Sequence, residues 1–149
     1  MLLEKPLGYL LGQTMRIYKN KLLSRLKEVN TEISFEEFLL LLQLNERDDL
    51  TQQDLANQLQ KDKSIILRQI NTLIEKRFVV RLPDREDKRK KNLIMTQKGH
   101  ESLVCAKEIG KNLSDELLLG LNTEDLQIFQ KVLEKIQENS GIEEDGCNC

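Results

Sequence analysis

The chain has 149 residues, enough for one domain to bury a sizeable core. Its formal net charge is -2, which argues against a protein that coats nucleic acid through an overall excess of positive charge. Aromatic residues make up 4% of the chain and Trp is absent, which argues against base-stacking platforms for single-stranded nucleic acid.

The N-terminal segment gives no sign of a targeting or membrane element. No apolar run reaches the roughly 18 residues that a membrane helix needs. Residues 1–6 lack the apolar core of a secretion signal. We therefore expect no membrane partner and a cytoplasmic protein.

The first two predicted helices are strongly apolar. A long helix begins near Pro6 and runs towards Lys27, and its broad apolar face needs a partner surface. Ser34 and Glu37 have the spacing of a capping box that opens the helix predicted at 35–45. Because this second helix is almost wholly apolar, we expect it at the centre of the domain.

A helix, a tight connection and a second helix are predicted over 51–76. Thr51 is an N-cap residue with Asp54 at the capping-box position, so the first helix begins there. The second helix, at 63–76, carries one apolar stripe, made of Ile66, Ile70, Leu73 and Ile74. Its opposite face holds Lys63, Ser64, Arg68, Gln69 and Thr72. Short polar groups and cations on that face suit a DNA major groove.

Two strands are predicted at 78–82 and 92–95, with Leu50 a candidate for a short third strand. The loop between the two strands contains five cations and three anions, a net charge of +2. Such a loop can lie along phosphates or reach a minor groove, whereas the alternative is a solvated loop. Its position directly after the two-helix unit favours the DNA-binding interpretation.

Two further helices are predicted in the C-terminal part. Thr96 caps a helix that runs to about residue 119, with an inward stripe of Val104, Ile109, Leu113 and Leu117. Asn122 or Thr123 caps the last helix. The first, fifth and sixth helices carry more apolar surface than one small domain can bury, which predicts a homodimer. We expect the acidic, glycine-containing residues 140–149 to be disordered.

An ordered set of residues between about 7 and 139 carries a family resemblance. The set comprises 50–56, Lys63, Ser64, Arg68, 73–76, Val79, Arg81, Asp84, Asp87, Lys88, Arg89, Leu93, Met95, Thr96 and Gly99. It resembles the MarR family of bacterial transcription regulators. The resemblance implies a mainly α fold with a small β wing, a winged helix-turn-helix that binds pseudo-palindromic double-stranded DNA as a homodimer.

The resemblance also implies how the chain is divided and regulated. Residues 31–96 would be the DNA-binding domain, and residues 1–30 and 97–139 would be the dimerisation helices. A repressor of this family would carry a small-molecule effector pocket between its first, second and fifth helices. The sequence does not identify that effector.

Roles in DNA binding can be assigned within this element. Arg68 and Gln69 can make bidentate contacts to guanine and adenine. Contacts to phosphates or base edges are expected from Gln52, Gln53, Lys63, Ser64 and Thr72. In the wing, the resemblance puts the tip cation at Arg89 or Lys88, with Asp87 holding the loop in shape. Arg85 and Lys90 are the next candidates.

Three residues depart from the family pattern. Ile65 and Leu67 stand where the family has small polar residues, on the face of Ser64 and Arg68. They either contact thymine methyl groups or are buried by a neighbouring element. Arg77 stands where the family often has Gly, and a left-handed backbone there would cost about 1 kcal/mol.

Other functions have weaker support. The winged fold can serve as a protein–protein interaction module. Cys147 and Cys149 form a Cys-x-Cys that could act as a redox or metal sensor, whereas Cys105 is expected in the core. His100 is the only histidine. The sequence contains no phosphate-binding glycine motif, so we expect no enzyme, no cofactor and no metal site.

Overall fold

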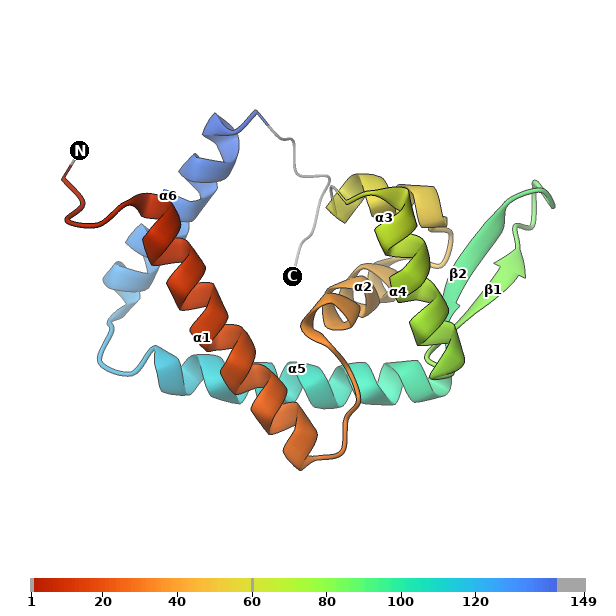
Figure 1. Cartoon of the computed structure of the whole chain (residues 1–149), viewed down its shortest axis with the longest axis horizontal. Coiled ribbons are helices and arrows are strands. Elements are labelled where there is room, and N and C mark those ends of the chain that lie inside the picture. The colour runs from red at the N-terminus through yellow and green to blue at the C-terminus, as the bar shows by residue number, and fades with distance from the viewer. Residues whose placement is uncertain (1, 60, 142–149) are drawn as a thin grey trace. The chain divides into compact units, whose positions relative to one another are not determined.

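The computed structural model describes residues 2–59 and 61–141 and contains six helices and a two-stranded sheet (Figure 1). The chain divides into two compact units, Met1–Leu113 and Ser114–Cys149, and α5 spans the division. The elements are α1 Leu7–Glu28, α2 Phe35–Glu46, α3 Gln52–Leu59, α4 Lys63–Glu75, β1 Val79–Pro83, β2 Lys91–Met95, α5 Gln97–Leu117 and α6 Thr123–Asn139. The mainly α fold with a small β wing is therefore confirmed.

The two strands form an antiparallel hairpin that projects from the end of α4 (Figure 1). Its register pairs Val79 with Met95 and Pro83 with Lys91. The carbonyl oxygen of Leu50 accepts a hydrogen bond from the Leu93 N–H at 2.9 Å. Leu50 thus contacts β2, but within the described residues the sheet has two strands and no third.

The helix N-termini agree with the sequence in two cases and correct it in one. The Asp54 N–H donates to Thr51 Oγ1 at 3.2 Å and the Thr51 N–H donates to Asp54 Oδ2 at 2.8 Å, so that capping box is confirmed. Asn122 caps α6 in the same reciprocal way. At α2 only one of the two hydrogen bonds of the predicted capping box is present. Ser34 Oγ accepts from the Glu37 N–H, but the Glu37 carboxylate turns away to bind Lys76.

Helix α2 lies at the centre of the core of the first unit, as its composition predicts. Leu40 and Leu41 are fully buried among side chains of α3, α4 and the hairpin. The predicted stripe of α4 is confirmed, because Ile66, Ile70 and Leu73 are fully buried there. This packing fixes which face of α4 points outward.

The predicted inward stripe of α5 is confirmed in part. Leu113 is buried and Ile109 is partly buried against the same cluster, but Val104 is 66% exposed and Leu117 is also exposed. The buried apolar side chains before Ile109 are Leu103 and Ala106. Neighbouring residues of a helix point about 100° apart, so Val104 faces outward when Leu103 faces the core. Leu113 and Ala106 pack against Leu22 and Leu26 of α1 in a second small cluster.

Large apolar side chains also remain exposed on α1 and α6. On α1 they are Leu7, Tyr9, Leu11, Met15 and Ile17, and on α6 they are Ile128, Phe129 and Val132. Helix α6 buries no residue in the described chain. Within the described ranges, no helix has the length and apolar content to cross a bilayer.

The turn after α4 is joined to the start of α5 by hydrogen bonds. The Thr96 N–H donates to the Phe78 carbonyl at 3.0 Å, and Thr96 Oγ1 donates to the Arg77 carbonyl at 2.6 Å. The same hydroxyl oxygen accepts from the Gly99 N–H. Arg77 itself has a φ of 64°, so this position has the left-handed backbone that the glycine of the family pattern would favour.

Candidate nucleic-acid interface

The outward face of α4 is polar at its centre. With Ile66 and Ile70 turned into the core, Ser64 and Arg68 lie one helical turn apart on the opposite side, and both are exposed. Lys63 is exposed at the start of the same helix. Ser64 and Arg68 therefore share one accessible face, whereas Lys63 is accessible about 100° away from Ser64 around the helix.

Ile65 and Leu67 are exposed on the same helix, at 37% and 41%. At about 100° per residue they lie on opposite flanks of the Ser64–Arg68 centre rather than at the centre itself. Among the described residues no neighbouring element buries them. The alternative prediction, that a neighbouring element of the chain buries Ile65 and Leu67, is therefore wrong.

Gln69 and Thr72 lie at the edge of the outward face, and both are half-buried. Thr72 Oγ1 donates to the Arg68 carbonyl of the previous turn at 3.0 Å. Gln69 Oε1 is buried without a hydrogen-bond partner among the described residues. The sequence placed both residues with Arg68, but the rotation of the helix gives them a less accessible position.

A groove of about 740 Å³ lies between the start of α3, the start of α4 and the base of the wing. It brings together four predicted residues, namely Gln52, Gln53, Lys63 and Lys90. Lys91 and Arg47 add positive charge, while Asp49, Asp54 and Asp84 also line the groove. The N-terminal end of α3 adds backbone N–H groups that favour an anion.

Asp84 organises the loop of the wing, a role that the sequence analysis did not assign. Its carboxylate accepts hydrogen bonds from the Asn92 side chain at 2.7 Å and from the N–H groups of Asp87 and Glu86. The Asn92 hydrogen bond, followed by those from the backbone, lowers the pKa of Asp84 below its ordinary value. An aspartate directly after Pro83 at a strand end is a typical turn residue, which is the signal that could have identified it.

Asp87 and Arg89 lie at the tip of the wing. Asp87 Oδ1 accepts from the Arg89 backbone N–H at 3.1 Å and from Arg89 Nε at 3.2 Å. The Arg89 side chain is nevertheless 92% exposed, so its guanidinium projects into solvent. Arg85, Lys88 and Lys90 are exposed as well. The wing thus presents cations from several directions around one shaped loop.

Arg81 links the wing to α4, a second role that was not assigned from the sequence. Its Nη2 donates to Asn71 Oδ1 at 2.8 Å. Asn71 lies on the exposed face of α4, and Arg81 points out from β1. This hydrogen bond joins the two elements that carry the predicted DNA contacts.

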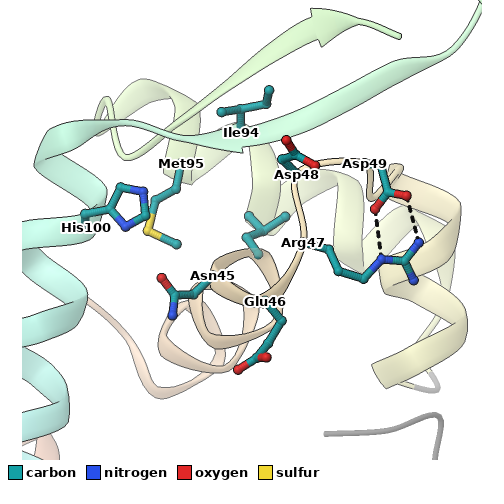
Figure 2. Close-up of a pocket in the computed structure, with 9 residues that line it drawn as sticks. Asn45, Glu46, Arg47, Asp48, Asp49, Ile94, Met95 and His100 are labelled. Carbon is teal, nitrogen blue, oxygen red and sulfur yellow. Dashed lines mark hydrogen bonds and ion pairs between the residues drawn. The ribbon is translucent and has the colours of Figure 1, made fainter. Parts of the chain in front are cut away.

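A separate pocket of about 530 Å³ lies between the end of α2, β2 and the start of α5 (Figure 2). Arg47 donates two hydrogen bonds to Asp49, at 2.8 and 2.9 Å. This hydrogen bonding lowers the pKa of Asp49. Figure 2 shows His100 beside Met95, away from that pair. Exposed His100 has no carboxylate or thiol cluster around it, since no group of three or more metal-ligating side chains occurs in the described residues.

Of the three cysteines, only Cys105 lies among the described residues. Cys105 is half-buried in α5, with its Sγ 3.9 Å from Thr31 Oγ1. Cys147 and Cys149 lie outside the described residues, so the sensor interpretation of the C-terminal pair stays a prediction. The same holds for the predicted disorder of the tail beyond Gly141.

Comparison with known proteins connects this geometry to one group of regulators. Residues 33–91 match the model of the MarR family. The chain is similar to the uncharacterized HTH-type transcriptional regulator YybA of Bacillus subtilis (strain 168), with 24% identity over 117 residues that cover 78% of each chain.

Solved structures give the same result for the whole fold. The crystal structure of the transcriptional regulator PA3341 is 28% identical, with a TM-score of 0.77 over 91% of this chain and 98% of that one. The transcriptional repressor CouR bound to a 23-mer DNA duplex is 22% identical, with a TM-score of 0.79 over 88% and 92%. The winged-helix fold is thereby confirmed.

Proposed function

We propose that this chain is a regulator of the MarR family, whose model residues 33–91 match, and that it represses transcription by binding a pseudo-palindromic operator in double-stranded DNA. The observation that carries the proposal is the joint exposure of Arg68 on α4 and Arg89 on the wing. Arg81 and Asn71 tie these two elements together. One helix and one cationic loop held in this way suit a major groove and the adjacent phosphates.

The contacts divide into base recognition and phosphate binding. Arg68 on the outward centre of α4 would read guanine with a bidentate pair of hydrogen bonds. Ser64 and Lys63 would serve the same groove or its rim. Gln52, Gln53 and Lys90, which line the groove at the start of α3, would hold phosphates, together with the wing cations Arg85, Lys88 and Arg89.

A homodimer follows from the apolar surface that the chain leaves exposed. Residues 1–30 and 97–139 would supply the interface, where the exposed side chains of α1 and α6 would be covered. Residues 31–96 would bind DNA. Two recognition helices would then lie one helical turn of DNA apart, roughly 34–36 Å. Such a regulator would act in the cytoplasm.

An effector would act by changing that spacing. A ligand shifts the equilibrium only if it binds the DNA-competent and incompetent arrangements with different affinity. A hollow of about 540 Å³ at the C-terminal end of α1 is one place within the first unit where a small molecule fits. Leu23, Lys27 and the residues 30–34 line it.

The experiment is fluorescence anisotropy with two kinds of duplex, over a series of salt concentrations. One is the DNA upstream of the protein's own gene, and the other is a set selected from a random library. We expect tight binding with a steep dependence on salt for the wild type. Arg89→Ala should reduce affinity and the salt slope by about one ion, and Arg68→Ala should relax the sequence preference.

Lys21→Ala is the matched control, because Lys21 is an exposed cation on α1, outside both DNA-binding elements. Since residues 1–30 would belong to the dimer interface, sedimentation should first show that this variant self-associates like the wild type. It should leave affinity and salt slope unchanged. Absence of binding to every duplex at low salt would contradict the proposal. If Arg68 and the wing cations proved dispensable while a protein partner was bound, the fold would be serving as an interaction module instead.

A further inference from the structure

The groove-facing part of α4 combines a polar centre with two apolar flanks. On the basis of the proposed function, we propose that Ile65 and Leu67 recognise thymine methyl groups. Each operator half-site would then carry A·T pairs on both sides of the base pair that Arg68 contacts.

The geometry places the two side chains on the walls of the groove-facing surface. Ser64 and Arg68 are separated by four residues and so point in nearly the same direction. Ile65 and Leu67 point about 100° to either side of Ser64 and Arg68, respectively, and are exposed by 37% and 41%. A helix seated on its Arg68 side in a major groove would therefore present one apolar group towards each side.

The chemistry of the groove leaves one feature for such groups. Neither side chain has a hydrogen-bond donor or acceptor, so neither can read the polar edges of guanine, cytosine or adenine. The thymine methyl group is the apolar feature that the major groove displays. Contact with it removes apolar surface from water on both partners.

The surroundings favour DNA over a protein as the occupant of this surface. Between Lys63 and Ile74, α4 contains two cations and no acidic residue. The exposed cations of the wing adjoin the same helix through the Arg81–Asn71 hydrogen bond. Two side chains offer far less area than the roughly 1,000 Å² that a specific protein interface needs. A polyanion with scattered methyl groups matches both the charge and the small apolar area.

The test uses duplexes selected from a random library by the wild-type protein. The selected sequences should share thymines on both sides of the position that Arg68→Ala relaxes. Each such thymine is then replaced by uracil, which removes only the methyl group. Loss of one buried methyl should weaken binding about fourfold.

Variants assign each methyl group to a side chain. Ile65→Ala should abolish sensitivity to uracil at one of the two thymines, and Leu67→Ala should abolish it at the other. Both residues are exposed and Ala favours helices, so thermal melting should show folded proteins. Val29→Ala is the matched control, since Val29 is 49% exposed at the end of α1, outside α4 and the wing. Once its self-association is shown to match the wild type, because residues 1–30 would belong to the dimer interface, it should keep sensitivity at both positions.

Four results would overturn the inference, and they can be told apart. If a duplex is selected but uracil changes nothing, thymine methyls are not read. If uracil weakens binding of the wild type, Ile65→Ala and Leu67→Ala equally, the methyls are read by other side chains. In both cases the proposed function stands. If both variants instead weaken self-association, a second copy of the chain covers these residues. If no duplex is selected at all, the proposed function fails together with the inference.

Discussion

The ammonium group of Lys76, the residue that follows helix α4, lies 3.0 Å from a carboxylate oxygen of Glu37 on α2. The same nitrogen donates to the Glu32 carbonyl at 2.5 Å. The Glu37 side chain is only 8% exposed. The C-terminal end of α4 is therefore held to α2 and to the loop before it through one side chain.

Lys76→Met should lower the free energy of unfolding by about 2 kcal/mol, because the nearly buried Glu37 carboxylate loses its cation. The value is set below that of a fully buried pair because Lys76 is partly exposed. Chemical denaturation measures it. Lys135→Met is the control, since the Lys135–Glu138 pair is about two-thirds exposed and should contribute little. An equal loss of unfolding free energy in the two variants would show that the Lys76–Glu37 pair stabilises the fold no more than an exposed pair does.

Gly99→Ala should destabilise the protein by about 2 kcal/mol or more. A β-carbon at Gly99 would collide with the Phe78 carbonyl oxygen and with Met95 Cγ, and the first of these is rigid backbone. Gly12→Ala is the matched control, because a β-carbon there meets nothing within 4 Å and Ala favours a helix interior by up to about 1 kcal/mol. Thermal unfolding of both variants should shift the midpoint in opposite directions. A tolerated Gly99→Ala would contradict the close approach of α5 to Phe78.

Arg77→Gly should be more stable than Arg77→Ala by about 1 kcal/mol, because the φ of 64° is unfavourable for a residue with a β-carbon. Both changes remove the same charge and side-chain contacts, so their difference isolates the backbone. Urea denaturation of the pair measures it. If Arg77→Ala were the more stable, the left-handed turn would have to be absent.

The hydrogen bonds of Asp84 predict a dependence of the wing on pH. They lower its pKa, so they stabilise the folded wing above the ordinary aspartate pKa of about 3.9, and this contribution is lost as the pH falls through the lowered native value. Titration of the carboxyl carbon by NMR should give a low pKa in the wild type. Asn92→Ala removes the largest cause and should raise that pKa. Unchanged titration in the variant would show that Asn92 does not stabilise the charged form.

The parts of the fold that local chemistry decides could be predicted. The capping box of Thr51 and Asp54 joins residues three apart, and the sequence shows both members. Glu37 has the same spacing from Ser34, yet its partner is Lys76, 39 residues along the chain. No local pattern distinguishes the two cases, because the choice depends on which cation the tertiary fold brings near.

The site shows the same division. The exposure of Arg68 follows from the apolar stripe on the other side of α4, which the sequence displays. The half-burial of Gln69 could not be foreseen, because the width of the buried stripe depends on what packs beside the helix. Asp84 was missed for another reason. Its donors Glu86 and Asp87 belong to the local turn, but the Asn92 side chain lies on the other strand, and only the closed hairpin brings it to Asp84.

The hydrogen bonds around Thr96 also connect helix α4 mechanically to helix α5. That one residue fastens the turn at Arg77 and Phe78 to the first turn of α5, and Lys98 adds a bond to the Lys76 carbonyl. We therefore expect the part of helix α5 up to Leu113 to move together with the end of α4. A rotation of that part of α5 would then also reorient α4 and the base of the wing.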